Sequence, residues 1–175
     1  MIYATTSVSK TDQKKVERLF DFIEMVNKSQ VRAGFLKDRR YEDGSSVINV
    51  AYKQEFGGIS SITKSTVPPR PFIRPAFESN RYDWINIWKD GVKKIFEDIL
   101  KSSFASGREK YTKLLERLGG VVVKDIKYAI DATTSPPLAL FTKMERRRRG
   151  YYNYHPLIDT GLMKNSVSYR IETKE

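Results

Sequence analysis

Two long apolar stripes lie in the second half of this 175-residue chain and constrain its fold more than any other feature. Apolar residues recur three and four positions apart over residues 84–99 and again over residues 111–130. That spacing puts the apolar side chains on one face of an α-helix. Residues 102–107 interrupt the pattern, so we expect two long helices. Gly119 and Gly120 lie inside the second one, where each costs about 1 kcal/mol relative to Ala, and they suggest a kink or a close helix contact.

The flanking segments predict a small sheet and further helices. Residues 12–27 carry a third apolar stripe typical of a helix, and apolar residues alternate over residues 30–37 and 167–171 as they do in strands. Residues 47–55 are ambiguous between strand and helix, and we favour a helix that begins at Val50. The sequence therefore predicts an α+β fold, with a small β-sheet packed against two or three helices and with long loops or arms.

Two long segments lack a regular pattern. Gly57 and Gly58 interrupt the chain, and the prolines at 68, 69 and 71 require an extended backbone, whereas Pro75 suits the first turn of a helix. Residues 133–158 show little periodicity. Irregular segments of this length are uncommon in compact domains unless they bind something. We therefore predict a single domain over residues 1–175 with arms at about 56–72 and 133–158.

The composition narrows the class of protein. Ten Tyr, nine Phe and two Trp supply material for a core, and the net charge of +11 suggests either a polyanionic partner or simple solubility. The chain has no Cys and one His, His155, so neither disulfides nor a zinc site are expected. No apolar run approaches a membrane span, and the first ten residues lack the apolar core of a signal peptide. We expect a protein made in the cytoplasm.

The motifs of common enzymes are not found in the sequence. There is no G-x-S-x-G nucleophile motif and no phosphate-binding G-x-x-x-x-G-K-[ST] loop. Glu97 and Asp98 are neighbours that point in different directions on a helix, and they are interpreted as part of a solvated face. His155 has no carboxylate partner nearby in sequence and is interpreted as a surface or interface residue. The sequence predicts no enzyme, no cofactor and no metal site.

A basic and aromatic stretch is the sharpest local feature. Four arginines, Arg146, Arg147, Arg148 and Arg149, precede a cluster of three tyrosines at 151, 152 and 154. Such residues can grip phosphates and stack on bases, or they can form a flexible loop that docks on acidic protein surfaces. We favour the protein surface. Replacing the four arginines with Ala is expected to weaken assembly or DNA retention and to leave the isolated fold intact.

Three stretches together carry a resemblance to a known family. They are Gln54-Glu55-Phe56-Gly57-Gly58, the Pro68-Pro69-Arg70-Pro71-Phe72-Ile73-Arg74-Pro75 segment, and Ser135-Pro136-Pro137-Leu138 followed after the basic stretch by residues 156–169. Their order and spacing resemble the neck and tail-completion proteins of tailed bacteriophages, which include head–tail joining and virion morphogenesis proteins. The resemblance covers residues 31–171. The arginine run is richer than the usual linker of that family.

The resemblance implies a structural virion protein at the head–tail junction. Such a protein forms a homo-oligomer, here expected to be a hexameric ring, which completes or terminates the tail and joins it to the head connector. The expected partners are the head-side connector, the tail tube or terminator protein and, without sequence specificity, genomic DNA. The alternative is a basic nucleic-acid-binding phage protein that acts in DNA packaging or regulation. The expected location is the virion neck, after synthesis in the host cytoplasm.

The residues expected to contact partners come from the three matching stretches and the arginine run. Residues 159–161 also suggest an Asx-type turn or a helix start before the final strand, with the turn favoured over a binding site. Phe56 and Phe72 are candidates for anchoring in a neighbour's pocket, although burial in the core is an equal alternative. The full set is Phe56, Gly57, Gly58, Pro68, Pro69, Arg70, Pro71, Phe72, Arg146, Arg147, Arg148, Arg149, Leu157, Ile158, Asp159, Thr160 and Gly161.

Overall fold

The computed structural model describes residues 10–60, 64–101 and 104–174 and has an α+β fold, as predicted. Its described elements are six helices and two antiparallel sheets of two strands each. In chain order they are α1 (Lys10–Lys28), β1 (Ser29–Gly34), α2 (Val47–Phe56), β2 (Gly58–Ile59), β3 (Thr66–Val67), α3 (Ile73–Lys101), α4 (Phe104–Ala132), α5 (Leu140–Arg148), α6 (Leu162–Ser166) and β4 (Ser168–Thr173).

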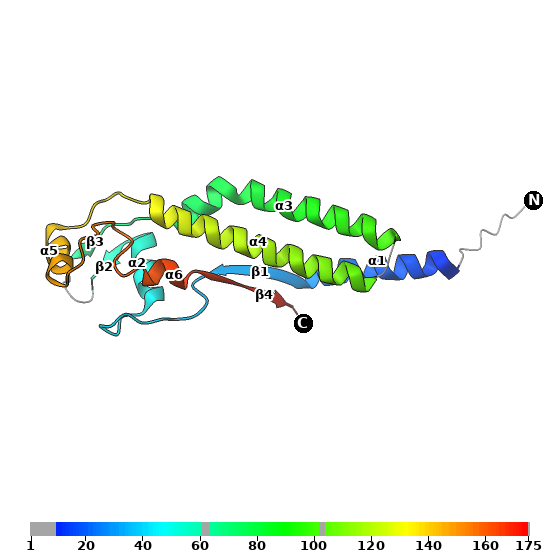
Figure 1. Cartoon of the computed structure of the whole chain (residues 1–175), viewed down its shortest axis with the longest axis horizontal. Helices are drawn as coiled ribbons and strands as arrows, with labels where there is room; N and C mark the ends of the chain where they lie inside the picture. Colours follow the sequence, from blue (N-terminus) through cyan, green and yellow to red (C-terminus); the bar gives the residue numbers. More distant parts are fainter. Residues whose placement is uncertain (1–9, 61–63, 102–103, 175) are drawn as a thin grey trace, which may run out of the picture.

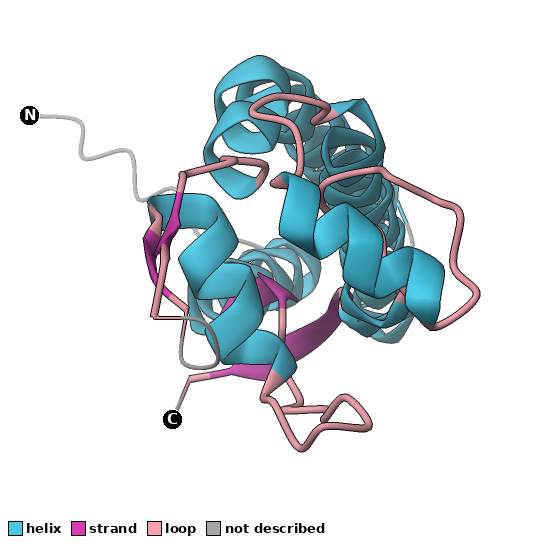
Figure 2. Ribbon diagram, turned by 90° about the vertical axis from the view of Figure 1, so that its left-hand side faces the viewer, coloured by secondary structure: helices cyan, strands magenta, loops and turns pink. Residues whose placement is uncertain are grey.

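The molecule has an elongated stem with a small lobe at one end (Figure 1). The stem consists of the α3–α4 helical hairpin, α1 and the antiparallel ribbon of β1 and β4. The lobe consists of α2, α5, α6, the β2–β3 hairpin and the loops between them, which gather around the α3–α4 end away from α1 (Figure 2). The two predicted long helices therefore form the frame on which the other elements pack.

Two clusters of buried side chains hold these parts together. The stem cluster contains Phe22 of α1, Ile99 of α3 and Tyr111 of α4, and the rings of Phe22 and Tyr111 meet edge to face at 5.7 Å. The second cluster joins Val47 of α2 and Met163 of α6 to residues of α3 and α4. Since this second core includes residues of both parts, the lobe is packed onto the stem and is not a separate appendage.

Gly119 confirms the predicted close contact, although its partner is a strand. α4 runs as one helix through Gly119 and Gly120, and the ring of Tyr169 in β4 lies directly against Gly119. A Cβ atom at Gly119 would overlap that ring, whereas a Cβ atom at Gly120 would meet nothing within 4 Å. The glycine at 119 thus lets the β1–β4 ribbon approach α4 closely.

Several element boundaries differ from the predictions. α2 begins at Val47 and not at Val50, because the side chain of Ser46 accepts a hydrogen bond from Asn49 N (3.2 Å) and caps the helix. The first strand ends at Gly34, earlier than predicted. The arm predicted at about 56–72 contains the β2–β3 hairpin, and its residues 61–63 lie outside the described part of the chain.

The largest correction concerns the second arm. Residues 133–158 were predicted to be irregular, but residues 140–148 form α5. This helix has no apolar stripe toward the core, because the side chain that it buries there is Arg146, while Leu140, Phe141 and Met144 are exposed. A search for apolar periodicity could not detect a helix that is anchored by a charge.

Candidate functional site

The stretches that carry the resemblance lie mostly in the lobe, although they are far apart in sequence (Figure 1). Three charged side chains are buried there: Glu55 and Arg70 from the first two stretches, and Arg146 from the arginine run that separates the two halves of the third. Burial of an unpaired charge is costly, so each of them must be satisfied by hydrogen bonds. Their partners explain how the irregular segments of the lobe are held in place.

Glu55 caps the N-terminus of α3. One of its carboxylate oxygens accepts hydrogen bonds from the backbone amides of Phe72 (2.7 Å) and Ile73 (2.9 Å), and the other accepts from the backbone amide and the Nε of Arg74 (both 3.1 Å). Burial alone would raise the pKa of Glu55, but these donors outweigh burial and hold the pKa below its ordinary value. A negative charge at this position also suits the positive end of the helix dipole.

Arg70 ties the first predicted arm to the second. Its guanidinium donates to the carbonyl oxygens of Pro136 (2.6 Å) and Pro137 (2.9 Å) and to the side-chain oxygen of Gln54 (3.0 Å). Backbone carbonyl oxygens that are buried in irregular segments need hydrogen-bond donors from elsewhere in the chain. The arginine fork satisfies two of those carbonyls and fixes the two proline-containing segments side by side.

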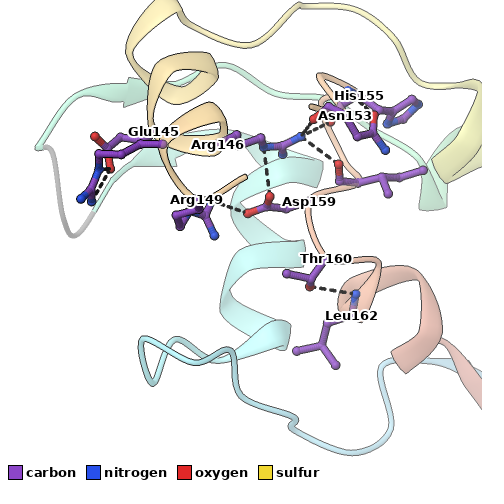
Figure 3. A network of polar contacts seen from close by, with 10 residues as sticks. Glu145, Arg146, Arg149, Asn153, His155, Asp159, Thr160 and Leu162 are labelled. Atoms are coloured by element: carbon purple, nitrogen blue, oxygen red, sulfur yellow. Dashed lines mark hydrogen bonds and ion pairs between the residues drawn. The ribbon is translucent and has the colours of Figure 1, made fainter. Parts of the chain in front are cut away.

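Arg146 organises the loop between α5 and α6 (Figure 3). One terminal nitrogen donates to the carbonyl oxygens of Asn153 (2.9 Å), His155 (2.8 Å) and Ile158 (2.8 Å). The Nε atom forms an ion pair with Asp159 at 3.3 Å. Only 5% of Arg146 is exposed, and burial lowers the pKa of its guanidinium while the Asp159 carboxylate opposes that shift. The side chain nevertheless stays protonated at neutral pH.

These contacts correct part of the predicted partner-binding set. Arg70, Phe72, Arg146 and Leu157 are buried within the chain and cannot reach a partner directly. Phe72 is fully buried and lies edge to face with Phe35. Of the two alternatives for Phe72, it is therefore part of the core and not an anchor in a neighbour's pocket. Since Arg146 holds three carbonyls, replacing all four arginines is no longer expected to leave the fold intact. A run of arginines in a sequence does not reveal which of its members is buried.

The residues before α6 form the predicted turn, but its side-chain hydrogen bond is made by Thr160 and not by Asp159. Gly161 adopts the left-handed conformation (φ 79°) at the N-cap of α6, where a side chain would be strained. The side-chain oxygen of Thr160 accepts from Leu162 N at 3.3 Å, and Asp159 pairs with Arg149 at 2.8 Å. These three residues form a local turn that leads into α6 and β4.

A hollow of about 260 Å³ lies beside this turn, between α2 and the loop that precedes α6. Tyr41, Arg146 and Asp159 line it. Burial and then the negative charges of Asp159 and Asp43 raise the pKa of Tyr41 to about 12. Among the described residues, Arg146 Nε and Asp159 Oδ1 are buried without an aligned hydrogen bond, although they form an ion pair. Tyr41 was not singled out in the sequence, because nothing around it forms a recognisable motif.

His155 lies at the surface of the lobe, as the sequence suggested. Its Nε2 atom is 2.8 Å from the carbonyl oxygen of Asp131, and its Nδ1 atom is 3.2 Å from Leu157 N. Within the described residues, no group of three or more His, Asp and Glu side chains is placed to hold a metal ion. No described helix is long and apolar enough to span a membrane.

Several exposed residues of the lobe are aromatic or basic. Phe56 is 55% exposed, stacks at a tilt on Tyr52 (4.9 Å) and lies under the guanidinium of Arg74 (5.2 Å). Arg147 and Arg148 are exposed at the end of α5, and Tyr152 is 71% exposed in the loop that follows. A partner could reach these side chains without disturbing the lobe.

Apolar side chains also project into solvent from helices in separate parts of the molecule. They are Val16, Phe20 and Ile23 of α1, Ile48, Tyr52 and Phe56 of α2, and Leu140, Phe141 and Met144 of α5. In each helix they are spaced three, four or one residues apart and share one exposed side.

Comparisons with protein-family models, with curated proteins and with solved structures gave no match to this chain.

Proposed function

We propose that this chain is a structural subunit of a tailed bacteriophage that works at the head–tail junction. In this proposal, six copies form a ring that completes or terminates the tail and joins it to the head connector. Each copy contacts its two neighbours in the ring, the connector on one side and the tail on the other. The protein acts by assembling and not by catalysing a reaction.

The observation that carries the proposal is the amount of apolar surface exposed on separate helices. α1, α2 and α5 each expose several large apolar side chains on one side. Monomeric proteins rarely expose contiguous apolar patches of this kind, and a ring subunit needs several of them because it has several neighbours.

The family resemblance supports the same proposal. The matching stretches build the lobe, in which Glu55, Arg70 and Arg146 hold irregular segments in fixed positions. A rigid lobe presents Phe56 and the exposed side of α5 to partners with little loss of conformational entropy on binding. In this proposal the buried residues of the pattern position the exposed ones.

Labelling of intact phage particles tests the proposal. An antibody or gold label directed at this protein is expected to mark the junction of head and tail, and the isolated ring is expected to show sixfold symmetry by electron microscopy. A protein that is absent from the particle, or present elsewhere on it, would refute the proposed location. A ring with another symmetry would refute only the proposed number of subunits.

The nucleic-acid-binding alternative is favoured by one observation, the exposure of Arg147, Arg148 and Tyr152 beside one another in sequence. Arginines that pair with phosphates give an affinity that falls steeply with salt. Binding of a fluorescent DNA duplex should weaken as salt rises and should be lost in the double variant R147A/R148A. Arg18→Ala and Lys124→Ala, which change distant charges, serve as controls. Salt-independent binding or no binding would count against this alternative.

A further inference from the structure

Among the described residues, the sheet of β1 and β4 has two strands, so each strand has an outer edge. One bond at the end of the ribbon, from Lys174 N to Lys28 O (2.7 Å), shows which opposite residues of β1 and β4 are hydrogen-bonded pairs. These two residues are opposite each other in the same register that pairs Ser29 with Thr173. Hydrogen-bonded and non-hydrogen-bonded pairs alternate in an antiparallel ladder. Tyr169, Ile171 and Thr173 therefore turn their backbone N–H and C=O groups away from β1.

The outer edge of β4 is open in the part of the chain that the structure describes. No hydrogen bond from residues 10–60, 64–101 or 104–174 reaches the outward backbone groups of Tyr169, Ile171 or Thr173. β4 is also more exposed than β1, whose residues are mostly half-buried. A row of unpaired backbone groups on an exposed strand is a template for pairing with another strand.

We propose that this edge pairs with the same edge of a second copy of the chain. The two β4 strands run antiparallel about a twofold axis that passes beside Ile171, and they join the two ribbons into one four-stranded sheet. Ile171 then faces Ile171 of the other copy, and Tyr169 faces Thr173 in both directions. Each of these three pairs exchanges two backbone hydrogen bonds.

The charges on the exposed face of β4 select this register. With the axis at Ile171, Arg170 of each copy lies opposite Glu172 of the other, which is a favourable cross-strand pair. Moving the axis by one residue either way would oppose Arg170 to Arg170 or Glu172 to Glu172, which is unfavourable. Arg170 and Glu172 lie on the side of the ribbon opposite α4 and are accessible for this contact, since Arg170 is exposed and Glu172 half-buried.

The edge of β1 is less suited to the same contact. Pairing two β1 strands about Val31 would oppose Arg32 to Gln30, which gives no pair of opposite charges. Within its own chain, Glu172 already pairs with Arg32 (2.8 Å) and with Arg170. A carboxylate can accept several hydrogen bonds, so an additional arginine from a second copy can join this cluster.

This inference goes beyond the proposed function, because it concerns how two free chains meet and does not depend on the phage. Failure of the particle-labelling experiment would leave it standing. Conversely, a monomeric free chain would refute the pairing through β4 and would leave the proposed role in the virion untouched.

A single cysteine tests the position of the axis, since the natural chain has none. In the proposed dimer the Cα atoms at position 171 lie about 5.5 Å apart, which is within the range of a disulfide. Mild oxidation of the full-length Ile171→Cys variant is expected to give a disulfide-linked dimer on a non-reducing gel. The control variant Ser168→Cys, at an exposed position away from the axis, is expected to stay unlinked. Equal linkage of both variants, or linkage of neither, would overturn the proposal.

Two proline variants test the edge itself and cover the case in which the cysteine variant misfolds. Thr173→Pro removes an outward N–H, whereas Lys174→Pro removes the inward N–H that bonds to Lys28. By analytical ultracentrifugation, the natural chain is expected to sediment as a dimer of two 20.3-kDa copies. Dimerisation should be at least tenfold weaker in Thr173→Pro and nearly unchanged in Lys174→Pro. A monomeric natural chain, or equal effects of the two prolines, would contradict the proposed pairing.

Discussion

Arg146 satisfies three backbone carbonyls of the lobe through one of its terminal nitrogens. Arg146→Ala would leave these carbonyls and the Asp159 carboxylate without their donor. We expect the free energy of unfolding to fall by about 3–5 kcal/mol, as it does when one partner of a buried ion pair is removed. Urea denaturation followed by circular dichroism measures this change.

The neighbouring arginine provides the control for this prediction. Arg147 is exposed, and Arg147→Ala is expected to change the free energy of unfolding by no more than about 0.5 kcal/mol. Similar losses in the two variants would mean that the lobe does not depend on Arg146. Arg146→Lys should not restore stability, because an ammonium group lacks the planar fork that reaches both the carbonyls and Asp159.

Glu55 makes stability depend on pH in a predictable direction. Its pKa is lower in the folded chain than in the unfolded chain, so folding favours the ionised carboxylate. This contribution is fully present above the ordinary Glu pKa of about 4.3 and is lost as pH falls toward the folded pKa. Glu55→Gln should therefore cost about 1.5–3 kcal/mol at neutral pH, since it removes charge-assisted hydrogen bonds. The cost of Glu55→Gln should shrink as the pH falls below the ordinary Glu pKa of about 4.3.

Urea denaturation at several pH values measures the difference between the natural chain and Glu55→Gln. Glu97→Gln is a suitable control, because this exposed carboxylate lies near the C-terminus of α3, remote from the N-terminus that Glu55 caps. A cost that stays constant across the acidic range would show that the ionised form of Glu55 contributes no stability.

The roles of Glu55, Arg70 and Arg146 could not be predicted from the sequence. A charged residue has the same chemistry in a solvated loop and in a buried cluster, and only its partners distinguish the two cases. Here the partners are mostly backbone carbonyls and amides, which every residue carries and which leave no signature in the sequence. The stretches around these residues were identified as important, but Arg70 and Arg146 were expected to contact partners, and Glu55 was given no role of its own.

At the scale of elements, the contact between α4 and β4 depends on the absence of a side chain at Gly119. Gly119→Ala would improve helix propensity, but its Cβ atom would overlap the Tyr169 ring and force the strand or the ring to move. We expect net destabilisation of about 1–3 kcal/mol, the usual cost of overpacking. Thermal denaturation of the purified variants measures this effect.

Gly120 is the matched control, because the next position of the same helix is open. Gly120→Ala should stabilise the chain by about 0.5–1 kcal/mol through helix propensity alone. Stabilisation by both substitutions would show that Tyr169 does not pack closely on α4. Destabilisation by both would show that α4 is not a regular helix at this point.

The elements with apolar stripes were predictable, and those with charged anchors were not. The α3–α4 hairpin follows from its two stripes, and β1 and β4 follow from alternation, because in each case burial of apolar side chains drives the element to form. α5 was missed because its apolar residues face solvent and its buried residue is an arginine. The apolar residues of α5 therefore indicate an exposed surface and not a core.

At the scale of the whole molecule, the stem determines the shape. A compact domain of 175 residues has a radius of gyration of about 16 Å. We expect small-angle X-ray scattering of the dilute chain, or of Thr173→Pro to avoid pairing, to give a clearly larger value because the helical hairpin extends beyond the lobe (Figure 1). A value near that of a compact domain would mean that the stem folds back in solution.

The pairing of β1 with β4 has a consequence for the order of folding. β1 follows the first helix, whereas its partner strand comes after α6, so almost the whole chain is made before the ribbon can form. Contacts between such distant segments form slowly, because a large loop must close first. During synthesis, Val31 and Ala33 of β1 therefore have no strand partner until β4 is made, although α3 and α4 are already complete. A chain truncated before Ser168 would leave β1 without its partner strand and α4 without the cover of β4, and such exposed surface is what chaperones bind.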